Sequence, residues 1–222
     1  MINGKSSCRA RLSSGLYVIT PDSLNESDMY DRIACVLRCG ITALQYRSKT
    51  LPYAERAVTA KTLQKLCRQT GTPLIINDDI ELALAIGAEG VHLGRHDQDY
   101  RPLVASQSRK MIVGISCYDS LELAREGVAA GVDYVAFGSF FPSSTKPNTA
   151  RAQRDLLIAA KQELRVPIVA IGGITPQNAP SLLDAGANIL AAISSVFGQA
   201  DVAAAVIEFN QLFVRKNISK YV

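Results

Sequence analysis

The chain alternates short apolar segments with longer amphipathic ones. Eight short segments rich in Val, Ile and Leu are typical of strands, and they are residues 15–20, 42–48, 73–78, 90–94, 111–116, 134–139, 167–173 and 188–194. Apolar residues recur at helical spacing in residues 27–40, 54–71, 80–86, 120–131, 150–164 and 175–186. Several of these helical segments end at glycine, as helices often do, and the helical pattern is weakest at residues 100–107.

A short repeat accompanies the second, fourth, sixth and eighth expected strands. In each copy a glycine that ends a helix leads through a turn into the strand, and the copies are residues 39–47, 87–94, 130–138 and 185–194. Two of the other strands begin at Pro73 and Pro167, where the missing N–H costs little. Eight strand-helix units in this alternating style predict an α/β fold, a single (β/α)8 TIM barrel. A doubly wound open sheet is the alternative, but no Gly-rich dinucleotide loop follows the first strand.

The expected domain organisation is simple. No linker rich in Pro, Gly or Ser divides the chain, so we expect one barrel domain over residues 15–222. Residues 1–14 are polar and basic and lack the apolar stretch of a secretion signal. We interpret them as an N-terminal extension that need not be well ordered.

Composition narrows the class of protein. The 222 residues are 48% hydrophobic and 20% charged, without an apolar run of bilayer-spanning length, which predicts a globular cytoplasmic protein that does not enter a membrane. The net charge of +4 permits anionic ligands, but no Lys/Arg stripe indicates nucleic-acid binding. The five cysteines are scattered and odd in number, which favours reduced thiols over a disulfide framework or a zinc site.

Polar residues gather where the expected strands end, and in a barrel that end carries the chemistry. Gln45, Arg47 and Lys49 alternate after the second strand and therefore share one side of it. One amide and two cations on one side suit a phosphate or diphosphate, although a solvated strand edge would have the same pattern.

Adjacent acids close the third strand. Asp79 is expected to be the N-cap of the helix at residues 80–86. Asp78 is then either a solvated neighbour of this cap or a metal ligand. Together with Asp97, which follows the fourth strand, it would form the oxygen-rich site that Mg²⁺ prefers. We favour the Mg²⁺ site because the neighbouring residues predict a phosphorylated ligand.

A second anion site is expected after the seventh and eighth strands. The pair Gly172 and Gly173 precedes a helix start, and Ser194 and Ser195 follow the eighth strand, which is the usual place of a phosphate cradle in barrels. The loop at residues 143–146, with sequence SSTK, is either a mobile lid over a ligand or an ordinary polar loop.

The sequence indicates no specific chemical role for the remaining polar residues near the strand ends. Ser116, at the end of the fifth strand, is either a substrate contact or a turn hydroxyl. His92 is expected to be packed within its strand, and His96 to lie in a loop. No Ser/His/Asp arrangement for nucleophilic catalysis can be assembled from these residues.

An ordered set of segments resembles the thiamine-phosphate synthase family from about residue 15 to residue 197. The segments are LYVIT, LQYRSK, INDDIELAL, GVHLGRHD, VGISCY, FGSFFPSSTK, VAIGGI and AISSVFG. The resemblance implies a (β/α)8 barrel that joins a pyrimidine diphosphate to a thiazole phosphate with Mg²⁺. It also implies that diphosphate leaves first and that a resonance-stabilised cation is captured by the thiazole nitrogen, with no protein nucleophile.

The resemblance also implies roles for individual residues. Contacts to the pyrimidine diphosphate would come from Gln45, Tyr46, Arg47, Ser48, Lys49, Asn77, Ser116 and Lys146, of which Arg47, Lys49, Ser116 and Lys146 would be catalytic. The thiazole phosphate would be held by Ser143, Ser144, Thr145, Gly173, Ile193 and Ser194, and Mg²⁺ by Asp78 and Asp97.

Some features depart from the family pattern or leave alternatives open. Arg95 adds a charge beside the expected metal site, where it would either assist diphosphate binding or compete with the metal. A thiazole tautomerase would not need the diphosphate residues, and a non-catalytic sensor of thiamine phosphate would be expected to have lost them. We expect a monomer or homodimer that acts on small molecules.

Overall fold

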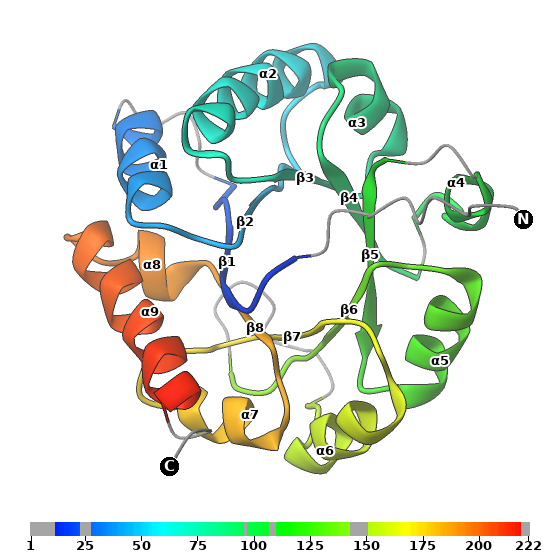
Figure 1. Ribbon diagram of the computed structural model, residues 1–222. Coiled ribbons are helices and arrows are strands. Elements are labelled where there is room, and N and C mark those ends of the chain that lie inside the picture. The colour runs from blue at the N-terminus through cyan, green and yellow to red at the C-terminus, as the bar shows by residue number, and fades with distance from the viewer. Residues whose placement is uncertain (1–11, 23–27, 96, 107–109, 143–150, 219–222) are drawn as a thin grey trace, which may run out of the picture.

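The eight strands close into a parallel barrel in chain order, so that each strand pairs with the next and the last pairs with the first (Figure 1). The computed structural model describes residues 12–22, 28–95, 97–106, 110–142 and 151–218. The strands are β1 Gly15–Ile19, β2 Ala43–Tyr46, β3 Leu74–Asn77, β4 Gly90–Leu93, β5 Ile112–Tyr118, β6 Tyr134–Phe137, β7 Ile168–Ile171 and β8 Ile189–Ala192. The (β/α)8 barrel expected from the sequence is confirmed.

Helices surround the barrel. They are α1 Met29–Arg38, α2 Tyr53–Thr70, α3 Ile80–Ile86, α4 Arg101–Ala105, α5 Leu121–Ala130, α6 Arg154–Glu163, α7 Ala179–Ala185, α8 Ser194–Phe197 and α9 Val202–Ile218. The short α4 agrees with the weak helical pattern there. Two helices, α8 and α9, were not among those expected. Among the described residues, no helix combines the length and the apolar character needed to cross a bilayer.

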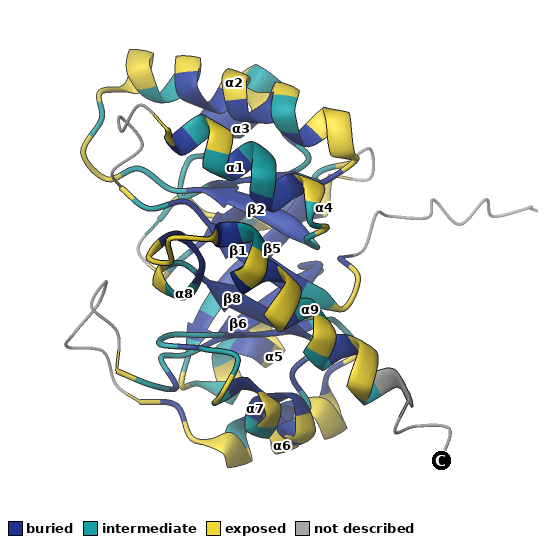
Figure 2. Ribbon diagram, turned by 90° about the vertical axis from the view of Figure 1, so that its left-hand side faces the viewer, coloured by how far each residue is buried: buried dark blue, intermediate teal, exposed yellow. Residues whose placement is uncertain are grey.

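The barrel strands contribute to two apolar layers, one on each face of the sheet. The outer layer lies between the strands and the helices, and the inner layer fills the barrel with side chains that alternate with it along each strand. Figure 2 shows the buried strands at the centre and the exposed outer faces of the helices. Leu12 belongs to the inner layer, with 7% of its surface exposed. The apolar packing inside the barrel therefore includes a residue before Gly15.

The sequence repeat has a structural role at the amino-terminal ends of the strands. The polar residue after each Gly-apolar pair accepts a hydrogen bond from the backbone N–H of the preceding strand in three of the four copies. These bonds are Leu74 N to Glu89 at 3.1 Å, Val113 N to Asp133 at 2.8 Å and Ile168 N to Asn188 at 3.0 Å. In the first copy, Thr42 instead donates from its hydroxyl to the carbonyl of Ser13 at 2.8 Å. The repeat thus ties neighbouring strands together on the face opposite the mouth.

The last helix, α9, joins the end of the chain to its first helix and strand. Helix α9 packs against α1 and β1. Arg32, on α1, donates hydrogen bonds to the carbonyls of Phe197 and Gln199 at 2.5 and 2.9 Å. Phe197 is the last residue of α8, and Gln199 lies between α8 and α9. The two hydrogen bonds therefore connect α1 to this segment of the chain.

Candidate active site

A cavity of about 800 Å³ opens at the carboxyl ends of the strands. This volume is typical of small-molecule sites. Seven of the expected site residues line it, and they are Gln45, Arg47, Asn77, Ser116, Gly173, Ile193 and Ser194. Apolar side chains of the inner layer, including Ile19, Val169 and Ile171, form part of its wall. The cavity thus joins the two expected anion sites across an apolar interior.

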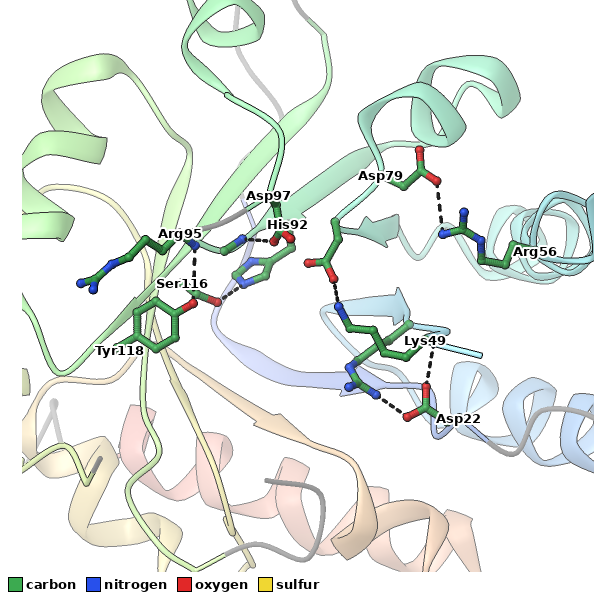
Figure 3. A network of polar contacts seen from close by, with 12 residues as sticks. Asp22, Lys49, Arg56, Asp79, His92, Arg95, Asp97, Ser116 and Tyr118 are labelled. Atoms are coloured by element: carbon green, nitrogen blue, oxygen red, sulfur yellow. Dashed lines mark hydrogen bonds and ion pairs between the residues drawn. The ribbon is translucent and has the colours of Figure 1, made fainter. Parts of the chain in front are cut away.

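The cationic side of the mouth is organised by an acid that the sequence did not single out. Asp22, in the loop after β1, accepts a hydrogen bond from Arg47 Nη1 at 2.5 Å and another from the backbone N–H of Lys49 at 3.1 Å. The Lys49 ammonium forms an ion pair with Asp78 (Figure 3). Arg47 and Lys49 are therefore positioned by carboxylates at the same edge of the barrel.

The carboxyl groups of Asp78 and Asp97 come together from β3 and β4. Burial acts to raise the pKa of Asp78, but hydrogen bonds with Asp97 and Lys49 outweigh burial and hold the pKa below its ordinary value. Burial raises the pKa of Asp97, and the hydrogen bond and charge of Asp78 raise it further. The Gly94 N–H also donates to Asp97 at 2.6 Å. Two acids this close are an electrostatic arrangement that a cation relieves.

The backbone at Asp78 is itself unusual. Its φ angle of 65° lies in the left-handed region, which Asp tolerates better than most residues. Its neighbour Asp79 has an extended backbone and accepts a hydrogen bond from Leu82 N at 2.8 Å, as an N-cap does. The prediction that Asp79 caps the helix is confirmed. The left-handed turn at Asp78 thus separates the capping carboxylate from the one at the mouth.

The opposite side of the mouth brings together the expected cradle residues. Gly172, Gly173, Ser194 and Ser195 all line the cavity. Gly173 has a φ of 62°, and a Cβ there would lie 2.2 Å from the Pro142 carbonyl oxygen. Only glycine fits this position, because both the backbone conformation and the close approach exclude a side chain.

The cavity floor is a chain of hydrogen-bonded side chains. Gln45 Nε2 lies 3.0 Å from the Tyr17 hydroxyl, which lies 3.0 Å from the Tyr134 hydroxyl. His92 Nδ1 lies 3.0 Å from the Tyr134 hydroxyl, and His92 Nε2 lies 2.9 Å from Ser116 Oγ. The expectation that His92 is packed in its strand is confirmed, since only 7% of its surface is exposed, but it also lines the cavity.

Five expected residues in the described part of the chain do not line the cavity, and they are Tyr46, Ser48, Lys49, Asp78 and Asp97. Tyr46 is 2% exposed and packs in the outer layer, because strand alternation turns it away from Gln45 and Arg47. A substrate contact from its side chain does not fit this placement. Ser48 accepts a backbone hydrogen bond from Leu51 N at 3.4 Å and does not line the cavity.

Arg95 turns away from the paired acids. Its guanidinium lies over the Tyr118 ring, 5.6 Å from the ring centre, and Figure 3 shows it directed away from Asp97. In this conformation the Arg95 guanidinium forms no ion pair with Asp78 or Asp97. The expected residues Ser143, Ser144, Thr145, Lys146 and His96 lie outside the described residues.

The donor set can be tested for a metal ion. Within the described part of the chain, no group of three or more His, Cys, Asp or Glu side chains could hold a metal. Asp78 and Asp97 supply carboxylate oxygens, the type that Mg²⁺ prefers, and Mg²⁺ is commonly held by one or two carboxylates plus ligand phosphates and water. The residues present therefore fit Mg²⁺ bound together with a phosphorylated ligand.

Comparisons with known proteins agree with this geometry. The model of the family described as thiamine monophosphate synthase matches residues 16–196. A thiamine-phosphate synthase of Thiobacillus denitrificans is 47% identical over 90% of this chain and 94% of its own length, and one of Methylobacillus flagellatus is 48% identical over 90% and 95%. The solved structure of a thiamine phosphate pyrophosphorylase from Pyrococcus furiosus is 33% identical, with a TM-score of 0.81 over 92% of this chain and 98% of that one. The chain therefore belongs to the thiamine monophosphate synthase family of transferases.

Proposed function

We propose that this protein condenses 4-amino-2-methyl-5-(diphosphooxymethyl)pyrimidine with 4-methyl-5-(2-phosphooxyethyl)thiazole to give thiamine phosphate and diphosphate. The observation that carries this proposal is one cavity with a different anion-binding surface at each side. Arg47 lines one side and is joined through Asp22 to Lys49, which pairs with Asp78, and Gly173 and Ser194 line the other side. A substrate pair with one diphosphate and one monophosphate suits this arrangement.

The proposed reaction requires electrostatic stabilisation of the charges that develop on the leaving diphosphate and on the pyrimidine methyl carbon. The C–O bond between the pyrimidine methyl carbon and the diphosphate breaks, and the electron pair leaves with the diphosphate. The thiazole nitrogen then donates its lone pair to the same carbon and becomes the positively charged nitrogen of the product. Neither step transfers a proton to the protein, and neither needs a protein nucleophile.

The protein groups would act on the leaving group and on orientation. Arg47 and Lys49 would bind the diphosphate and stabilise the charge that develops on it. Held by Asp78 and Asp97, Mg²⁺ would neutralise further negative charge on the diphosphate. The apolar wall around Val169 and Ile171 would limit water access to the cation before the thiazole captures it. Lys146, which the family resemblance adds to the diphosphate site, would act with Arg47.

The reducing cytoplasm is the location that we propose for this reaction. The four described cysteines, Cys35, Cys39, Cys67 and Cys117, are all free thiols, and the last two are buried. Free thiols are typical of proteins in a reducing compartment.

Diphosphate release tests the proposed function. We expect release only when the pyrimidine diphosphate, the thiazole phosphate and Mg²⁺ are all present, and we expect exhaustive chelation to abolish it. Full activity after chelation would contradict the metal assignment. Binding of thiazole phosphate without any diphosphate release would instead favour a tautomerase, and binding of thiamine phosphate alone a sensor.

A further inference from the structure

The chain of side chains across the cavity floor ends at Ser116, and the residue before it is His92. Gln45, Tyr17, Tyr134 and His92 are 3%, 1%, 0% and 7% exposed. Buried polar groups need hydrogen-bond partners, so the protons of these hydroxyl, amide and imidazole groups cannot be placed independently. The direction of one bond in such a chain sets the direction of the next.

The Gln45 amide is the starting point for assigning the donor and the acceptor of each hydrogen bond in this chain. Its nitrogen donates to the Tyr17 oxygen, and we infer that the Tyr17 hydrogen is donated to the Tyr134 oxygen, the other side-chain contact of this hydroxyl. With this assignment the Tyr134 hydrogen is donated to His92 Nδ1. A neutral imidazole that accepts at Nδ1 donates from Nε2, and Ser116 Oγ lies 2.9 Å from Nε2.

A glycine makes the contact between β6 and β4 possible. Gly114 on β5 lies between His92 on β4 and Tyr134 on β6 in the strand register. A Cβ at Gly114 would lie 1.9 Å from Cζ of the Tyr134 ring, so the ring occupies the space above this glycine. Tyr134 thereby reaches across β5, and its ring stacks against His92 with an interplanar angle of 20° and 5.5 Å between ring centres.

We propose that His92 is a positioning residue that orients Ser116 as a hydrogen-bond donor to the pyrimidine diphosphate. Because Ser116 Oγ accepts from His92, its own hydrogen is available to a ligand in the cavity that it lines. A ring nitrogen of the pyrimidine is an acceptor of the matching type. The identity of this ligand rests on the proposed function, whereas the orientation of Ser116 rests on the hydrogen-bond chain.

Two substitutions at His92 separate its two bonds. In His92→Asn the side-chain amide reaches the position of Nδ1 and loses the contact with Ser116. In His92→Gln the longer side chain carries an N–H to the position of Nε2. We expect Kd for the pyrimidine diphosphate, measured by calorimetry, to rise about tenfold in His92→Asn, the factor for one hydrogen bond, and to rise less in His92→Gln. Kd for the thiazole phosphate is expected to stay within about twofold in both variants.

A double-mutant cycle with Ser116→Ala decides whether His92 acts through Ser116. We expect the effect of His92→Asn on pyrimidine binding to disappear in the Ser116→Ala background. Equal effects in both backgrounds, or equal weakening of both substrates, would overturn the proposal.

Tyr134→Phe provides a second cycle if the His92 variants do not fold. It keeps the ring above Gly114 and removes the bond to Nδ1. Its effect should also disappear in the Ser116→Ala background, and an undiminished effect would count against the proposal. Tyr53→Phe is the control for loss of a tyrosine hydroxyl, because Tyr53 lies on the outside of α2 with 48% of its surface exposed.

The outcomes for the proposed function are distinct. Wild-type protein that binds the pyrimidine diphosphate but forms no product would contradict the synthase assignment, while the binding cycles would still test His92. Wild-type protein that does not bind the pyrimidine diphosphate would overturn both. Wild-type protein that turns over normally but shows additive effects would leave the function in place and overturn only the role of His92.

Discussion

Asp78 and Asp79 carry the same side chain at adjacent positions, yet their surroundings give them different roles. The left-handed backbone at Asp78 directs its carboxylate to Lys49 and Asp97, whereas Asp79 caps α3 and pairs with Arg56 at 3.3 Å. The pair therefore offers a matched comparison in which charge and size change equally at two neighbouring residues.

We expect Asp78→Asn to lower kcat for diphosphate release by roughly a hundredfold or more, the size of effect seen when one charge-stabilising group is lost. The fold should persist, since Asn also tolerates the left-handed region. Steady-state kinetics at unsaturating Mg²⁺, with a thermal melt of each variant, would measure this.

Asp79→Asn is the control for this experiment. Asn is as good an N-cap as Asp, so activity near that of the wild type is expected. Normal turnover by Asp78→Asn would refute its assignment as a metal ligand, and equal losses in both variants would indicate a general electrostatic effect.

At the scale of elements, the repeat before the even strands could be recognised in the sequence, but its bonds could not. The glycines that end helices and the following apolar residue indicate the turn, because glycine favours a positive φ. Which backbone N–H the next polar side chain would reach depends on the register between strands, which the sequence does not specify. Asp133 shows this well, because its partner Val113 is 20 residues away in the chain.

Asp133→Ala is expected to destabilise the protein by about 1–3 kcal/mol, because the Val113 N–H loses its partner at a buried site. Asp133→Asn keeps an oxygen acceptor and should cost less. Urea unfolding of the two variants measures the difference. Equal stability of Asp133→Ala and the wild type would show that this bond contributes nothing.

At the scale of the whole molecule, the closed barrel and several polar residues of the cavity lining could be predicted, because hydrophobic periodicity indicates which side of a strand is buried. Three features of the site could not. Asp22 does not belong to any recognisable sequence motif. Tyr46 was expected as a substrate contact because of the family resemblance, although strand alternation turns its side chain outward. The His92–Tyr134 contact depends on the space above Gly114. Contacts that cross from one strand to the next but one leave no periodic signal.

Because of its buried tyrosines, the protein is expected to lose stability as the pH rises in the alkaline range. Burial raises the pKa of Tyr17 and of Tyr134 above the ordinary value near 10. Above pH 10 the unfolded chain loses these protons while the native state keeps them, so the free energy of unfolding falls as pH rises. Below pH 10 this contribution is fully present.

We expect each of these tyrosines to contribute a decrease of about 1 kcal/mol per pH unit above pH 10. Urea unfolding at several pH values from 9 to 11, compared between wild type and Tyr17→Phe, would measure it. The variant should lose stability less steeply, and identical slopes would show that Tyr17 does not titrate as its burial requires.

The pairing of β1 with β8 also has a consequence for synthesis on the ribosome. The contacts from Gly15 to Ile189 and from Val18 to Ala192 join the first strand to the last. At 5–20 residues per second, the ribosome needs on the order of 10 to 35 seconds to extend the nascent chain from β1 to β8. During that time β1 can pair only with β2, and its other edge remains open. The barrel can therefore close only when nearly the whole chain has left the ribosome, and a chain interrupted before β8 would present that edge to chaperones.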